Sequence, residues 1–255
     1  MKRMDFNGFA GNWPFFRIRN NTVEKLAALH RRCGIEGGFV SSLEAIFYQD
    51  PWEAELELAR QLKGTGYLHL MTVNPTLPGW RDDLKRAMKQ LDIKGVRLVP
   101  GFQGYTLADA CVEELCGCLR EYGLPLVLTL RMKDERTMYM IQPRSIPMEE
   151  VAAFLEKYRE IPTLLTHIRA AEVEGLTPLL RERENLFADN SGFKDGMFVL
   201  DHMVLETAAR GHLVYGSGAP LMEMQATTMQ IDTAQIPEEE KQAIFAGEKL
   251  LAFCR

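Results

Sequence analysis

Short apolar runs rich in β-branched residues alternate along this chain with longer stretches in which apolar residues recur at helical spacing. Strands that alternate with helices in this way are typical of a parallel sheet covered by helices. The apolar runs number about eight, which is the number of strands in a (β/α)8 barrel. We predict strands at Arg3–Asn7, Gly37–Ser41, Tyr67–Val73, Gly95–Val99, Pro125–Leu130, Thr163–His167, Leu186–Asn190 and His212–Ser217.

The segments between these runs carry recognisable helix starts. Asn21 and Glu24 form a capping-box pattern, and Pro147 and Pro237 each precede acidic residues suited to the first turn of a helix. Between Leu107 and Tyr122, apolar residues recur every three or four positions and would share one helix face. No linker-like or repetitive stretch divides the series. We therefore expect one α/β domain, a (β/α)8 TIM barrel over residues 1–255.

The composition limits the partners and the compartment. The formal net charge is −5 and the basic residues are scattered, which argues against nucleic acid as a partner. The start has no apolar leader, and no run approaches the roughly 18 apolar residues of a membrane span, so we expect a cytoplasmic protein without a membrane contact. The five cysteines show no C-x-x-C spacing, so neither a disulfide framework nor a structural zinc site is expected. Pairing into a homodimer stays open.

In a barrel, the C-terminal ends of the strands converge on one pocket, so polar residues at those ends are the candidates for chemistry. One connection there, residues 131–147, is long and has no clear period; loops of this kind are often functional, although a surface excursion or an oligomer contact stays open. The candidates in chain order are Asp5, Asn7, Ser41, Ser42, Asn74, Arg97, Gln103, Tyr105, Arg131, Asp134, Glu135, Arg136, His167, Asp189, Asn190 and Ser217.

Several stretches carry a family resemblance. They are Asp5-Phe6-Asn7-Gly8, Gly95-Val96-Arg97-Leu98-Val99-Pro100 with Gly104-Tyr105, Gly123-Leu124-Pro125-Leu126-Val127, Leu164-Leu165-Thr166-His167, Tyr215-Gly216-Ser217-Gly218-Ala219-Pro220, and the closing helix near Ile244 to Leu251. Together they resemble the amidohydrolase superfamily, specifically its metal-dependent hydrolases of TIM-barrel fold. The resemblance implies a divalent metal ion that activates water. It implies as ligands a histidine pair after strand one, a histidine or modified lysine near strands four and five, a histidine on strand six and an aspartate on strand eight.

The sequence departs from that ligand pattern. Asn7 stands where a first-strand histidine is expected, Gly218 stands at the eighth-strand aspartate, and Thr129 or a neighbour occupies the fifth-strand position. Only His167 matches, and one imidazole with a neutral amide is a weak ligand set for a hydrolytic zinc ion. We therefore expect no metal ligands and no cofactor; if a metal is present, we expect zinc near His167.

The remaining candidates suggest proton transfer and carboxylate binding. We predict that His167 and a pocket carboxylate transfer protons, with Asp134 and Asp5 as the first candidates and Glu135 and Asp189 as alternatives. The substrate-binding candidates are the arginines Arg97, Arg131 and Arg136, which suit a carboxylate, and the neutral groups of Asn7, Gln103, Tyr105 and Asn190.

Structural interpretations stay open beside these roles. His167 ends an apolar strand and suits a hydrogen-bonded core histidine, residues 131–136 suit a solvated charge run, and Gln103 and Tyr105 suit loop packing. We interpret the other four histidines as structural; they are His30, His69, His202 and His212.

Two functions follow from these residues. The first is a hydrolase or related lyase that acts on a small carboxylated substrate. The alternative is a catalytically inactive relative that binds a small molecule or a partner protein, because a barrel alone does not define an activity. A barrel outside this superfamily, with other chemistry, is a third hypothesis.

Overall fold

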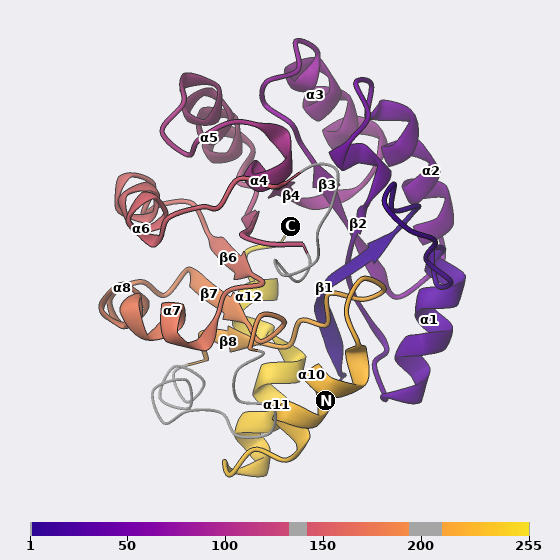
Figure 1. The fold of residues 1–255 in the computed structure, drawn as a ribbon, viewed down its shortest axis with the longest axis vertical. Helices are drawn as coiled ribbons and strands as arrows, with labels where there is room; N and C mark the ends of the chain where they lie inside the picture. Colours follow the sequence, from indigo (N-terminus) through magenta and orange to yellow (C-terminus); the bar gives the residue numbers. More distant parts are fainter. Residues whose placement is uncertain (1, 133–141, 194–210, 255) are drawn as a thin grey trace.

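A parallel eight-stranded sheet forms the centre of the molecule in the computed structural model, which describes residues 2–132, 142–193 and 211–254. Neighbouring strands pair in sequence order, from β1 to β8 (Figure 1). The strands are β1 (Met4–Ala10), β2 (Gly37–Ser42), β3 (Tyr67–Thr72), β4 (Ile93–Leu98), β5 (Leu126–Thr129), β6 (Thr163–Thr166), β7 (Leu186–Asp189) and β8 (Leu213–Val214). All eight predicted strands are confirmed, and so is the (β/α)8 barrel.

Helices surround the strands on the outside of the barrel (Figure 1). The longer ones are α1 (Val23–Arg32), α2 (Trp52–Leu62), α3 (Trp80–Gln90), α5 (Ala110–Tyr122), α6 (Met148–Lys157), α10 (Met224–Asp232) and α11 (Glu238–Ala246). The short ones are η1 (Glu44–Ile46), α4 (Pro100–Gln103), α7 (Ala170–Gly175), α8 (Thr177–Glu182) and α12 (Glu248–Leu251). Pro147 and Pro237 cap α6 and α11 as predicted, whereas α1 is capped by Thr22, one residue later than the predicted Asn21.

Backbone hydrogen bonds draw the two edges of the sheet together. The amide of Phe6 donates to the carbonyl of Tyr215, that of Phe9 to Ala219, and that of Gly218 to Asn7, each at 2.9 Å. These bonds pair backbone groups at the edge of β1 with the segment that follows β8. Both β1 and this segment contribute polar residues near the C-terminal end of the barrel.

The core has an inner and an outer part. Inside the barrel, one apolar cluster is built from alternate residues of the strands and is closed below by Leu250 of α12. Its fully buried strand members include Phe6, Phe39, Leu70, Val127, Leu164 and Phe187. Between the strands and the helices lies the larger apolar cluster, which includes the α5 face formed by Val112, Leu115 and Leu119. Of the predicted face, Leu107 and Leu115 are buried, whereas Cys111, Cys118 and Tyr122 are only partly buried against this cluster.

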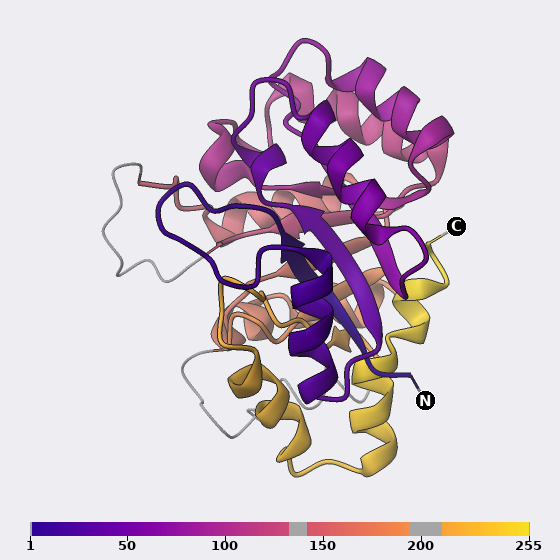
Figure 2. The same ribbon diagram turned by 90° about the vertical axis from the view of Figure 1, so that its right-hand side faces the viewer.

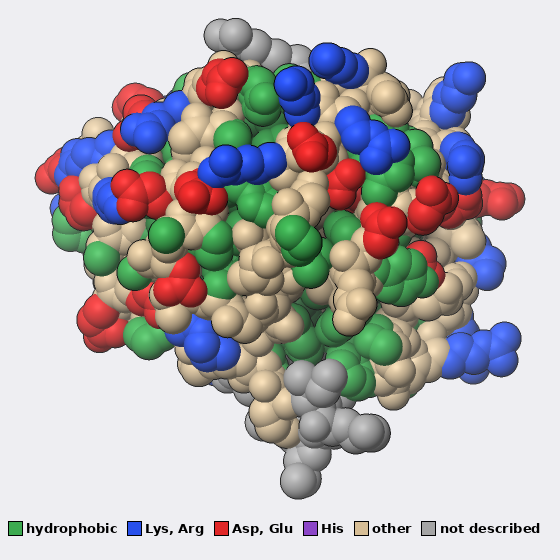
Figure 3. All heavy atoms as spheres, turned by 90° about the horizontal axis from the view of Figure 1, so that it is seen from above, with side chains coloured by type: hydrophobic (Ala, Val, Ile, Leu, Met, Phe, Trp, Pro, Cys, Tyr) green, Lys and Arg blue, Asp and Glu red, His purple; other side chains and the backbone are tan. Residues whose placement is uncertain are grey.

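The two ends of the barrel differ. Both termini lie on one side of the molecule, and the loop of residues 11–22 that follows β1 lies on the other (Figure 2). On the face shown in Figure 3, acidic and basic side chains are interspersed and neither sign forms a continuous patch. In the part of the chain that the structure describes, no helix has the length and hydropathy to span a bilayer.

Candidate active site at the C-terminal end of the barrel

A polar layer lies one step above the apolar interior, toward the C-terminal ends of the strands. Because strand side chains alternate between two faces, the residue two positions beyond each inner apolar residue also points into the barrel. These positions hold polar groups, all of them buried. They are Ser41, Thr72, Arg97, Thr129, Thr166 and Asp189. The sequence therefore places a buried polar ring where (β/α)8 enzymes have their active sites.

Arg97 is the cation at the centre of this layer. Its Nε donates to Ser41 Oγ at 2.8 Å, and its Nη1 donates to Asn7 Oδ1 at 2.8 Å and to Thr129 Oγ1 at 2.7 Å. Its Nη2 is buried without a hydrogen-bond partner. Burial lowers the pKa of Arg97 to about 9, against the opposing field of two aspartates, so the guanidinium stays charged at neutral pH.

The ring of Phe9 covers this guanidinium. The Arg97 Cζ lies 4.3 Å from the centroid of the Phe9 ring, a cation–π distance. The same ring stacks on His167, with centroids 6.4 Å apart and planes 17° from parallel. Phe9 therefore separates the cation and the imidazole from the loops above them.

His167 lies immediately beyond β6 in an unusual backbone conformation. Its φ is +54°, a region that non-glycine residues rarely adopt and that often marks functional positions. Its backbone amide is held by Asp189 Oδ1 and Ser191 Oγ, each at 3.0 Å. Its Nδ1 lies 3.4 Å from Asn7 Nδ2. The sharp turn directs the imidazole over the polar layer, where the sequence predicted it.

Asp189 is a buried carboxyl group at the end of β7. Both of its oxygens accept from the Ser191 hydroxyl at 2.8 Å, and Oδ1 also accepts from the backbone amide of His167. Burial raises the pKa of Asp189 to about 7, although these hydrogen bonds oppose the shift. A carboxyl group that titrates near neutrality can both give and take a proton at physiological pH.

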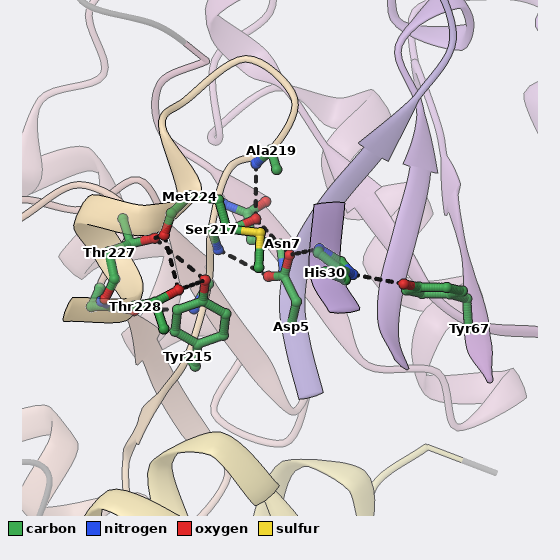
Figure 4. A network of polar contacts seen from close by, with 12 residues as sticks. Asp5, Asn7, His30, Tyr67, Tyr215, Ser217, Ala219, Met224, Thr227 and Thr228 are labelled. Carbon is green, nitrogen blue, oxygen red and sulfur yellow. Dashed lines mark hydrogen bonds and ion pairs between the residues drawn. The ribbon is translucent and has the colours of Figure 1, made fainter. Parts of the chain in front are cut away.

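Asp5 forms an anchor between elements (Figure 4). Its Oδ1 accepts from the amides of Asn7 and Ser217, and its Oδ2 accepts from His30 Nε2 at 3.0 Å and from Ser217 Oγ. Burial raises the pKa of Asp5, but His30 and the hydrogen bonds outweigh it and hold the pKa below 3.8. His30 in turn contacts the Tyr67 hydroxyl at 2.7 Å. The carboxylate thus ties α1 to the segment after β8.

Other predicted residues lie around the layer and not in it. Arg131 makes a bidentate ion pair with Glu172 of α7 and reaches the His167 carbonyl at 3.3 Å. Gln103, the last residue of α4, accepts from the Tyr105 hydroxyl at 3.1 Å. Their predicted contacts with a substrate stay predictions.

Asn190 faces away from the barrel interior. Its Nδ2 donates to the carbonyl of Thr227 at 2.9 Å and to Gln230 Oε1 at 3.2 Å, both on α10. Asp134 and Arg136 lie outside the described residues. Ser191, which holds both Asp189 and His167, was not among the predicted site residues; the only signal was its place in the polar Asn190-Ser191-Gly192 segment after a strand.

Aromatic and aliphatic side chains cap the polar layer. Trp13 packs edge-to-face against Phe47 at 5.3 Å and Phe102 at 5.6 Å. The buried members of this cap come from the end of β1 and from segments that follow several strands: Phe9, Trp13, Leu43, Ile46, Val99, Met132 and Leu221. Arg97, His167 and Asp189 are therefore buried below an apolar cap.

Fold and site together define a single-domain (β/α)8 barrel with a buried polar centre at the C-terminal ends of its strands. The family model for amidohydrolases matches residues 4–253, so this chain belongs to the amidohydrolase family. The search of curated proteins gave no match.

Solved structures of the same fold cover nearly the whole chain. The 5-carboxyvanillate decarboxylase from Sphingomonas paucimobilis has a TM-score of 0.72 at 14% identity and covers 100% of this chain and 99% of its own. A dihydroxybenzoic acid decarboxylase from Polaromonas, with manganese and 2-nitroresorcinol bound, has a TM-score of 0.70 at 12% identity, covering 99% and 96%. A second 5-carboxyvanillate decarboxylase, from Novosphingobium aromaticivorans, also binds manganese; its TM-score is 0.67 at 13% identity, covering 98% and 97%. At these identities the likeness shows the fold.

The expectation of no cofactor is contradicted by these comparisons, because two of the similar structures hold manganese. The metal in both structures is manganese, whereas zinc was the metal expected for this chain if it binds one.

The donor set of the described residues does not fit the usual ligand pattern. Within residues 2–132, 142–193 and 211–254, no three His, Cys, Asp or Glu side chains cluster to hold a metal ion. The Asn7 oxygen already accepts from Arg97, and Gly218 supplies no side chain. The described residues therefore offer His167 alone from the expected set.

Proposed function

We propose that this protein is an enzyme that binds a small carboxylated molecule at the C-terminal end of the barrel and acts on it as a hydrolase or a related lyase. The observation that carries the proposal is Arg97: a fully buried, charged guanidinium with Nη2 unpartnered, beside His167 and Asp189. A buried charge without an ionic partner is costly, and an anionic ligand would compensate it.

A carboxylate suits Arg97 better than other anions of similar size. The guanidinium is planar and presents its nitrogens as a fork that matches two carboxylate oxygens. Its Nε and Nη1 are occupied by Ser41, Asn7 and Thr129, so Nη2 is the donor left for a ligand. Because Arg97 and Phe9 are both fully buried, the side chains above them must move to admit the ligand.

The aromatic side chains of the cap favour an aromatic carboxylate as the substrate. Trp13, Phe47 and Phe102 present ring edges and faces to one another, and such surfaces also pack well on a planar ring. The similar structures support the same class, because their names describe decarboxylases of 5-carboxyvanillate and dihydroxybenzoic acid. This favours a lyase over a hydrolase.

Asp189 is the proposed proton-transfer group. Net decarboxylation converts a carboxylate and one proton into a C–H bond and CO2, so the enzyme must deliver a proton to the carbon that loses CO2. The pKa of Asp189, raised to about 7 by burial, suits a group that delivers a proton and recovers it from water in each turnover. His167, next to it, would contact the substrate.

The alternative is a protein that binds such a molecule without converting it. Asn7 and Gly218, at two positions where the family has ligands, favour this alternative. Turnover separates the two functions, whereas binding alone does not.

The test compares benzoate with benzamide, which has the same shape without the charge. Calorimetric titration, with and without added Mn²⁺, should show benzoate binding at least about tenfold more tightly, since a hydrogen bond to a charged group contributes about 1.5–3 kcal/mol. Arg97→Lys should remove most of that preference. Arg183→Lys, at another buried arginine that bonds only backbone carbonyls and Asn185, should retain it.

Product analysis then separates the functions. Incubation with 2,6-dihydroxybenzoate and 5-carboxyvanillate should release CO2, which Asp189→Asn should abolish while benzoate still binds. Equal affinity for benzoate and benzamide would refute the carboxylate site. Benzoate binding without turnover of any carboxylated aromatic tested would favour the non-catalytic alternative.

A further inference from the structure

Arg97 determines which atom of the Asn7 side-chain amide accepts hydrogen bonds and which atom donates them. A guanidinium only donates, so the Asn7 atom that meets Arg97 Nη1 at 2.8 Å must be the amide oxygen. The amide nitrogen of Asn7 therefore points to the opposite side. Arg97 thus fixes the orientation of the Asn7 amide, because only the amide oxygen can accept from the guanidinium.

The amide nitrogen of Asn7 carries two hydrogens and meets two groups. Nδ2 donates to Ser191 Oγ at 3.1 Å and lies 3.4 Å from His167 Nδ1. The Ser191 hydroxyl accepts here because its own hydrogen goes to Asp189. A proton on His167 Nδ1 would face the N–H groups of Asn7, so Nδ1 must hold a lone pair toward them.

We propose that Asn7 is a positioning residue that fixes the tautomer of His167, with the ring proton on Nε2, so that His167 acts as a neutral hydrogen-bond donor to an oxygen of the substrate. The tautomer follows from the described contacts alone, whereas the contact with substrate rests on the proposed function. The Nε2 edge lies against Gly218, where a Cβ atom would stand 2.5 Å from Nε2. The ring is held in plane by the stacked Phe9.

This tautomer changes the role expected for His167. A neutral imidazole that gives up its Nε2 proton becomes a strongly basic anion, so it is a poor acid, but it is a good donor to a carbonyl, phenolic or carboxylate oxygen. Proton transfer then belongs to Asp189, and His167 orients and polarises the substrate. The two titratable groups of the site thus have separate tasks.

Long-range ¹H–¹⁵N correlation spectra of the whole protein, labelled at histidine, test the tautomer directly. At about pH 8, where an ordinary imidazole with a pKa of about 6.5 is neutral, the His167 signals should show an unprotonated Nδ1 and a protonated Nε2. His212 supplies an internal reference for the opposite tautomer, because its Nδ1 lies 2.8 Å from the carbonyl oxygen of Leu186, which only accepts.

The variant Asn7→Asp tests the cause. A carboxylate accepts on both sides, so it keeps the bond from Arg97 and requires a proton on His167 Nδ1; the His167 signals should switch to a protonated Nδ1. Asn185→Asp makes the same charge change at a half-buried site before β7 and should leave the spectrum of His167 unchanged. Assignment uses the loss of one signal set in His167→Gln.

Each result has a distinct meaning. A protonated Nδ1 on His167 in the natural protein overturns the inference without any variant, and so does an Asn7→Asp spectrum identical to that of the natural protein. An unprotonated Nδ1 with no binding of benzoate sustains the tautomer and refutes the proposed function. Benzoate binding together with a protonated Nδ1 on His167 refutes the tautomer and sustains the proposed carboxylate site.

Discussion

The free energy of unfolding of the Asp189→Asn variant should increase, compared with that of the natural protein, as the pH rises. In the folded protein, burial raises the pKa of Asp189 to about 7, from an ordinary value of 3.8 in the unfolded chain. Between these values the folded state holds a proton that the unfolded state has lost. Stability therefore falls with rising pH until the folded carboxyl group also ionises, and the loss is complete above about pH 7.

The magnitude follows from the size of the shift. One pKa unit corresponds to about 1.4 kcal/mol, so ionisation of this group alone removes about 3 kcal/mol between pH 5 and pH 7. Asparagine resembles the protonated carboxyl group and has no ionisation. Its oxygen can still accept from the His167 amide and the Ser191 hydroxyl, as Asp189 Oδ1 does.

Urea unfolding at pH 5, 6, 7 and 8 measures the effect for both proteins. The free energy of unfolding of Asp189→Asn minus that of the natural protein should rise by about 3 kcal/mol from pH 5 to pH 8. Asp92→Asn, which removes a carboxylate whose side chain is 87% exposed, should give a difference that stays constant with pH. A constant difference for Asp189→Asn would show that this carboxyl group is ionised in the folded protein throughout the range.

Two further substitutions test the surroundings of the site. His30→Ala removes the imidazole that donates to the buried Asp5 carboxylate and should reduce the free energy of unfolding at pH 7 by about 1–3 kcal/mol; a loss below about 1 kcal/mol would contradict the anchor. Gly218→Ala places a Cβ atom 2.5 Å from His167 Nε2 in a backbone with φ of +68°, which by itself costs about 1–2 kcal/mol. Thermal unfolding should show a loss larger than this backbone cost, and a loss of only about 1–2 kcal/mol would mean that the imidazole moves aside.

The fold was predictable because its signal is local. Each strand is an apolar run bounded by polar residues, and the rule that parallel strands pair through helical crossovers supplies the topology. The boundaries are less well determined by pattern. The eighth strand is confined to Leu213–Val214, and the chain beyond it follows β1 through separate hydrogen bonds.

The site was predictable only in its location, because neighbouring residues on a strand face opposite sides. Asp189 points into the barrel and Asn190 points to α10, yet both are polar residues at one strand end. On β1 the alternation itself is broken: the register shifts between Asp5 and Gly8, and Asn7 reaches Arg97 although it follows the inward-facing Phe6. Periodicity gives no warning of such an irregularity.

Asparagine satisfies both neighbours of position 7 with two different atoms of one amide. Arg97 requires an acceptor there, and the lone pair of His167 Nδ1 requires a donor. Aspartate supplies two acceptors and lysine only donors, whereas the amide of asparagine supplies one of each on a short, rigid stem. Glutamine has the same groups but adds a methylene to a fully buried site. Asn7, one of the residues that depart from the family's ligand pattern, therefore meets the hydrogen-bonding needs of the buried arginine and of the imidazole.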